Sequence, residues 1–200
     1  MNLSRTSFVA AALALASVVA PVGFAAPAQA AINNQDPSVF ISGLAQEGFG
    51  ALRTGDRAAA KAKFRALLAQ HFAVDAIGDR LIRRWKPTLK PDQLAAYKAA
   101  LPNYIIGIYA DRLFEYANAD LKVIRTQNAA NGAAVVSQVT KPGQQPINAI
   151  WSVVKTPQGY KVSNLTVAGI NLTLTQAADF DSYIQRNGFD KLVAFMKAQG

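Results

Sequence analysis

The sequence predicts an α+β fold: N-terminal helices packed on a four-stranded antiparallel meander sheet, followed by C-terminal helices. Between residues 36 and 116, apolar residues recur three and four positions apart, which is the period of amphipathic helices. Between residues 121 and 168 they recur at every second position, in four runs separated by short connections. After residue 176 the helical period returns. Because helices and strands do not alternate along the chain, we expect the helices on one face of the sheet.

The first thirty residues have the features of a secretory signal peptide. Arg5 is the only charge before the apolar stretch 8–20, and Ala28-Gln29-Ala30 gives the small-x-small pattern of a cleavage site. The apolar stretch is too short for a membrane span. We therefore expect residues 1–30 to be removed and residues 31–200 to form one soluble domain in the periplasm.

Three helices are predicted before residue 87. The first begins at Asp36-Pro37, which supplies an N-cap and a proline at the first helical position, and it ends near Arg53. Asp56 and Asp75 are the caps expected for the second and third helices, and Pro87 stops the third. Their apolar stripes are Val39, Phe40, Leu44 and Leu52, then Phe64, Leu67, Leu68 and Phe72, and finally Ile77, Leu81, Ile82 and Trp85.

The longest helical pattern extends from about residue 90 to residue 116. Pro102 lies inside it and removes one backbone hydrogen bond, so we expect a kink or a break there. Residues 104–109 are apolar around nearly the whole circumference. A helix of this kind is buried on more than one side, either by the core alone or by the core and an apolar ligand.

Four strands are predicted at 121–127, 133–141, 147–155 and 160–168, with turn residues in each connection. Many of their residues are apolar on both faces, as in Val135-Val136 and Val153-Val154, whereas a sheet with one wet face alternates more cleanly. Helices, an oligomer or a bound apolar molecule could shield the second face, and plain protein core is the commonest cause. Helices at 176–186 and 189–197 complete the chain, separated by Asn187-Gly188.

The sequence offers little catalytic chemistry. There is no cysteine and one histidine, His71, and no set of side chains has the spacing of a metal site. Asp179 and Asp181 are two residues apart, so their side chains diverge on a helix and do not form an acid–base pair. They lie in the first turn of the predicted helix, where a negative charge interacts favourably with the helix dipole. We therefore predict that the protein is not an enzyme and has no metal or cofactor.

The charge balance points to acidic partners. Without residues 1–30 the chain has 20 basic and 12 acidic residues, a formal charge of +8. An exported protein rarely meets nucleic acid, so anionic lipid head groups or acidic protein faces are better candidates. The densest basic cluster contains Arg80, Arg83, Arg84 and Lys86. It is either a solvated helix face or a contact for a phosphate head group or a docking protein.

Two motifs near the C-terminus are specific. Residues 167–172 read V-A-G-I-N-L, and Phe180, Ile184, Gly188 and Leu192 follow with the spacing F-x₃-I-x₃-G-x₃-L. Together with the order of elements, these motifs resemble the MlaC-type family of periplasmic phospholipid-binding shuttles, also called the toluene-tolerance family. Three features depart from the family pattern. Ser163-Asn164 stands where the family often has an aromatic–acidic pair, and Ser152 follows Trp151 where the family often has a basic residue. Pro102 interrupts a helix that is usually continuous in the family.

The resemblance implies an apolar lipid cavity between helices and sheet, and a carrier that maintains outer-membrane lipid asymmetry. The implied partners are phospholipid, an inner-membrane ABC transporter complex with its lipid-binding subunit, and an outer-membrane lipoprotein complex. We expect a monomer. Arg80, Arg83 and Arg84 are candidates for head-group or partner contact. The candidate lipid-lining residues are Ile77, Leu81, Trp85, Leu101, Tyr104, Ile105, Ile108, Val136, Ile150, Val153, Leu165, Val167, Ile170 and Leu172, of which about half are expected to face the lipid.

Three alternatives stay open. One is a purely structural adaptor that uses the basic face. A carrier of the same family could bind a hopanoid or another apolar lipid instead of phospholipid. A small α+β enzyme is the weaker alternative, because it would need a buried acid or base beside the cavity.

Overall fold

The computed structural model describes residues 32–200, except for the side chains of residues 110–112. The predicted signal peptide and its cleavage site lie outside the described residues. The helices are α1 (Pro37–Arg53), α2 (Arg57–His71), α3 (Val74–Leu81), α4 (Pro91–Leu113), α5 (Leu172–Asn187) and α6 (Phe189–Gln199), with short 3₁₀ turns at Lys86–Thr88 and Phe114–Tyr116. The strands are β1 (Asp120–Ala129), β2 (Gly132–Thr140), β3 (Ile147–Thr156), β4 (Gly159–Val167) and β5 (Ile170–Asn171).

The predicted α+β fold is confirmed, with one more strand than expected. The strands pair antiparallel in the order β1-β2-β3-β4-β5, which is a meander. The fifth strand is a two-residue hairpin arm on the end of β4, formed because Ala168 (φ 49°) and Gly169 (φ 81°) turn the chain in the left-handed region. Immediately afterwards, the Asn171 side chain accepts a hydrogen bond from the Leu174 amide (3.0 Å) and caps α5. The helix therefore begins at Leu172, four residues before the predicted start.

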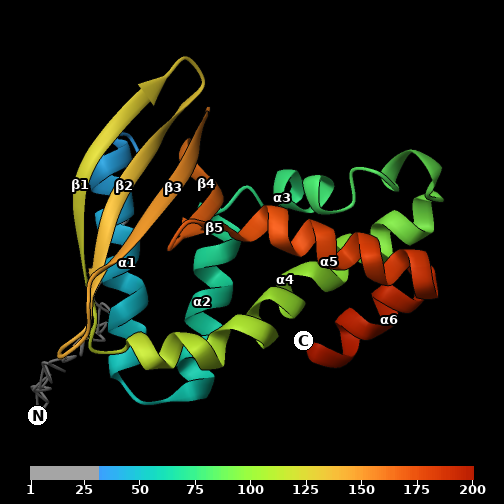
Figure 1. The fold of residues 1–200 in the computed structure, drawn as a ribbon, viewed down its shortest axis with the longest axis horizontal. Helices are drawn as coiled ribbons and strands as arrows, with labels where there is room; N and C mark the ends of the chain where they lie inside the picture. Colours follow the sequence, from blue (N-terminus) through green and yellow to red (C-terminus); the bar gives the residue numbers. More distant parts are fainter. Residues whose placement is uncertain (1–31) are drawn as a thin grey trace, which may run out of the picture. The chain divides into compact units, whose positions relative to one another are not determined.

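Helices α1 and α2 pack on one face of the sheet (Figure 1). Asp36 caps α1 as predicted, because its carboxylate accepts hydrogen bonds from the amides of Ser38 (2.8 Å) and Val39 (2.9 Å). The buried cluster on this side joins residues of the two helices to residues of three strands. Its members are Phe40, Ile41, Leu44, Leu67, Ala133, Val135, Val153 and Val162.

Helices α3, α4, α5 and α6 form a second core beside the sheet (Figure 1). Tyr97 of α4 lies at its centre, fully buried, and its hydroxyl donates a hydrogen bond to the Gly78 carbonyl at 3.0 Å. The rings of Phe180 and Phe189 pack against Tyr97 with centroid distances of 6.3 and 5.8 Å. This core anchors the C-terminal helices to α4.

Pro102 does not break α4, which is continuous from Pro91 to Leu113. Proline at this position forgoes one backbone hydrogen bond to the carbonyl of Lys98. The neighbouring Leu101 and Tyr104 side chains are buried, at 1% and 6% exposure, and their packing holds the helix on both sides of the proline. Of the two outcomes expected at Pro102, the break is therefore wrong.

Candidate functional site

A cavity of about 520 Å³ lies between the sheet and helices α1, α2, α3, α4 and α5. Its volume is within the usual range for small-molecule sites. Aliphatic and aromatic side chains form nearly all of its wall. The lining residues are Leu44, Ala45, Gly48, Phe49, Leu52, Phe64, Leu67, Leu68, Phe72, Ile77, Leu81, Leu101, Tyr104, Ile105, Ile106, Tyr109, Leu113, Tyr116, Leu121, Val139, Ile147, Ala149, Trp151, Val162, Asn164, Leu165, Val167, Leu172, Thr173 and Gln176.

Eight of the fourteen candidate lining residues lie in this wall. They come from α3, α4 and the β4–α5 segment. They are Ile77, Leu81, Leu101, Tyr104, Ile105, Leu165, Val167 and Leu172.

The other six candidates lie elsewhere, for identifiable reasons. Ala149 and Trp151 face the cavity, so Ile150 between them points to the opposite face of the sheet, as does Val136, its register partner on β2. Val153 is on the cavity side of the sheet but is covered by the core cluster of α1 and α2. Ile170 is 57% exposed on β5. Trp85 packs in the second core, and Ile108 faces a second pocket, described below.

The first two helices contribute wall residues that the sequence analysis did not assign to the site, such as Phe49 of α1 and Phe64 of α2. Their apolar stripes were visible in the sequence. A stripe indicates only which side of a helix is buried, and it does not separate a side chain that touches other side chains from one that borders a void.

Polar groups in the cavity wall are few and concentrated near α5. The Gln176 side-chain amide donates a long hydrogen bond (3.4 Å) to the Tyr104 hydroxyl. Burial raises the pKa of Tyr104, so its phenol stays neutral. On β4, the Asn164 Oδ1 atom is buried and has no hydrogen-bond partner among the described residues. These groups can orient a ligand, but none of them is an acid or base with a pKa suited to catalysis.

The sequence candidates for acid–base or metal chemistry do not lie in the cavity. His71 packs against the ring of Phe40 at 5.8 Å, and burial lowers its pKa. Asp181 accepts hydrogen bonds from Trp85 Nε1 (2.8 Å), Arg84 (2.9 Å) and Gln185 (2.7 Å), which is a structural role. Within residues 32–200 as described, no group of three or more His, Cys, Asp or Glu side chains could hold a metal ion.

Three of the four residues of the basic cluster form hydrogen bonds or ion pairs with other residues of the chain. Arg80 donates to the carbonyl of Ser163 at 2.9 Å, and Arg84 pairs with Asp181. Lys86 pairs with Asp79 at 2.6 Å. Arg83 is exposed. None of Arg80, Arg83 and Arg84 lines the cavity.

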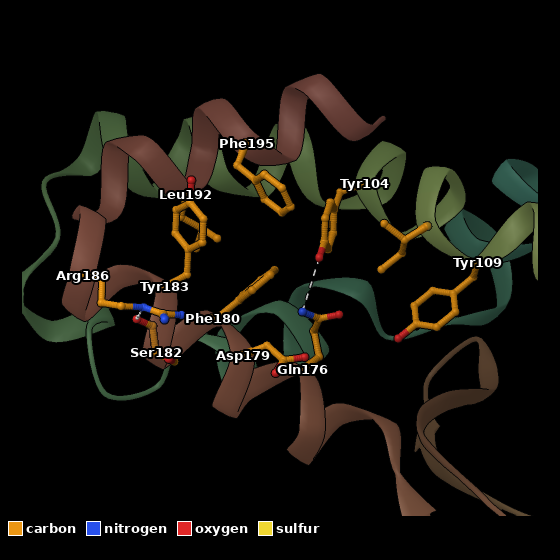
Figure 2. Close-up of a pocket in the computed structure, with 11 residues that line it drawn as sticks. Tyr104, Tyr109, Gln176, Asp179, Phe180, Ser182, Tyr183, Arg186, Leu192 and Phe195 are labelled. Carbon is orange, nitrogen blue, oxygen red and sulfur yellow. Dashed lines mark hydrogen bonds between the residues drawn. The ribbon is translucent and has the colours of Figure 1, made fainter.

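A second pocket, of about 450 Å³, lies between α4, α5 and α6 (Figure 2). It shares Tyr104, Tyr109 and Gln176 with the cavity, and its remaining wall combines aromatic, aliphatic, polar and charged side chains. The residues found only here are Ile108, Asp179, Phe180, Ser182, Tyr183, Arg186, Leu192 and Phe195.

No helix of the described residues is long and apolar enough to cross a membrane.

Comparisons with known proteins agree with this architecture. The family model described as MlaC protein matches residues 49–198. A search of curated proteins found no match. Among solved structures, the chain is similar to a phospholipid-binding protein from Ralstonia solanacearum, solved in complex with a phospholipid, with a TM-score of 0.69 and 22% sequence identity. The match covers 82% of this chain and 96% of that one, which establishes a shared fold.

Proposed function

The chain belongs to the MlaC family, and from this premise we propose that it is a phospholipid-binding protein whose cavity holds acyl chains. The observation that carries the proposal is the cavity itself: about 520 Å³ bounded almost entirely by apolar side chains. The similar fold of a protein solved with a bound phospholipid supports the same ligand class.

The energetics of such a cavity are sufficient for binding without any reactive group. Moving one methylene from water into an apolar site stabilises the complex by about 0.8 kcal/mol. Ten buried methylenes therefore contribute roughly 8 kcal/mol, which corresponds to a dissociation constant on the order of micromolar before ordering costs are subtracted. An apolar wall with few polar groups suits a carrier, which must release its cargo unchanged.

The proposed physiological role is that of a periplasmic shuttle. In this role the protein carries phospholipid between an outer-membrane lipoprotein complex and an inner-membrane ABC transporter, and so maintains outer-membrane lipid asymmetry. The secretory signal predicted in residues 1–30 supports the compartment. The formal charge of +8 after its removal supports contact with acidic lipid or protein surfaces.

Solvent extraction followed by mass spectrometry tests the ligand. Residues 31–200, purified without detergent, are expected to yield phospholipid at close to one molecule per chain. A hopanoid or another apolar lipid in the extract would replace phospholipid as the ligand. Preparations that contain no lipid and take up none from vesicles would refute lipid binding.

A further inference from the structure

We propose that the second pocket, between α4, α5 and α6, receives the head group of the bound lipid and selects a zwitterionic phosphodiester head over a purely anionic one. The inference rests on the proposed lipid binding, and it assigns the polar end of the ligand to a site separate from the basic cluster of α3.

The first support is that the second pocket and the apolar cavity share part of their walls. Tyr104, Tyr109 and Gln176 belong to the walls of both spaces. The hydrogen bond from Gln176 to Tyr104 spans the boundary at 3.4 Å, which is at the long limit for such a bond (Figure 2). When the acyl chains of a lipid lie in the cavity, the polar atoms of the lipid can replace this weak hydrogen bond with hydrogen bonds of their own to Gln176 and Tyr104. The head group then lies in the second pocket.

The second support is the polar stripe that α5 presents to the pocket. Gln176, Asp179, Ser182 and Arg186 follow one another at intervals of three and four residues, so they share one helix face. Arg186 Nε donates to the Ser182 carbonyl at 3.2 Å, which orients the guanidinium. Within the described part of the chain, neither the terminal nitrogens of Arg186 nor the carboxylate of Asp179 has a hydrogen-bond or ion-pair partner.

The charges of this stripe match a zwitterion. Arg186 supplies the planar group of donors that suits a phosphate, and Asp179 supplies a counter-charge for an ammonium. The two residues are seven positions apart, about 10 Å along the helix axis, and the long arginine side chain shortens the gap between the charged groups. An anionic head without a cation would gain from Arg186 but would be repelled by Asp179.

Aromatic rings from α4, α5 and α6 complete the pocket. Tyr183 and Phe195 stack with a centroid distance of 5.2 Å, and Tyr104 packs against Phe195 at 6.1 Å and Phe180 at 5.6 Å (Figure 2). Phe195 is 36% exposed, which is high for so large an apolar ring. Aromatic rings beside a carboxylate favour an ammonium group through cation–π attraction. By contrast, none of Arg80, Arg83 and Arg84 lines either space.

The test is a competition between two head groups with identical acyl chains. Residues 31–200 are incubated with vesicles of equal parts phosphatidylethanolamine and phosphatidylglycerol, reisolated, and their bound lipids quantified by mass spectrometry. Asp179→Asn is expected to raise the bound ratio of anionic to zwitterionic lipid about two- to five-fold, the range for one exposed charge pair. Arg186→Gln is expected to lower total uptake by a similar factor, because both lipids contain the phosphate.

Arg125→Gln on β1 and Asp92→Asn at the start of α4 make the same charge changes on exposed residues outside both pockets, so they should leave ratio and uptake unchanged. If the wild type loads lipid but Asp179→Asn and Arg186→Gln behave like these controls, the head-group site is refuted and lipid binding stands. If the wild type loads neither lipid, the proposed function fails, and the head-group site fails with it.

Discussion

Filling the cavity should weaken lipid binding while stabilising the empty protein, and Ala45→Leu is the substitution that separates the two effects. Ala45 is on α1, lines the cavity and is only partly buried, so its side chain borders open space. Alanine and leucine are both good helix formers, so the helix itself is little affected. The larger side chain occupies volume that an acyl chain would otherwise fill.

The magnitude follows from the number of carbon atoms exchanged. Leucine has three more side-chain carbons than alanine, so it displaces roughly three methylenes of the ligand at about 0.8 kcal/mol each. The loss of about 2.4 kcal/mol corresponds to a roughly fifty-fold higher dissociation constant. In the lipid-free protein the same carbons fill a void, and cavity filling of this kind commonly adds about 0.5–2 kcal/mol to the free energy of unfolding.

Both quantities are measurable on one preparation. Lipid affinity comes from titration of delipidated protein with vesicles, and the free energy of unfolding comes from urea denaturation of the same material. Ala95→Leu, on the exposed face of α4, is the matched control and should change neither quantity appreciably. Unchanged affinity in Ala45→Leu, together with higher stability, would show that the ligand does not occupy this part of the cavity and would refute the reasoning.

Two further predictions concern stability. Burial lowers the pKa of His71, so the unfolded chain binds a proton at this residue near pH 6.5, whereas the folded chain binds it only at lower pH. The free energy of unfolding should therefore decrease as the pH drops below about 6.5. His71→Gln should flatten the pH dependence of the urea midpoint in that range, and an unaltered profile would contradict the assignment. Tyr97→Phe removes the buried hydrogen bond to the Gly78 carbonyl and should lower the free energy of unfolding by about 1 kcal/mol. A urea midpoint equal to that of the wild type would show that this bond contributes nothing.

The sequence predicts the elements of this fold well because their caps and periods are local properties. Asp36, Asp56 and the apolar stripes determine where the first two helices begin and which side they bury. The cap expected at Asp75 is wrong, because α3 begins one residue before it and Ala73 stands at the N-cap. The start of α5 was misplaced because Leu172 and Leu174 continue the alternation of β4. The cap at Asn171 and the turn at Ala168-Gly169 override that alternation, and neither is visible in a pattern of apolar residues.

The site was harder to predict than the fold, because apolarity does not distinguish a cavity wall from a core. Val136 and Ile150 are as apolar as Leu165, but strand register turns them to the other face of the sheet. Trp85 interrupts the basic cluster in sequence, yet its indole nitrogen is held by Asp181, almost one hundred residues away. The polar stripe of α5 lines a pocket only because α4 and α6 enclose it, which is a property of tertiary packing.

Fluorescence quenching by phospholipid with brominated acyl chains reports directly where the acyl chains lie in the fold. The chain has two tryptophans: Trp151 lines the cavity, and Trp85 lines neither the cavity nor the second pocket. Trp85→Phe leaves only Trp151, and Trp151→Phe leaves only Trp85. We expect strong quenching of Trp151 and weak quenching of Trp85 as the brominated lipid is loaded. Loaded lipid that leaves Trp151 unquenched, or that quenches Trp85 equally, would contradict an acyl chain held between the helices and the sheet.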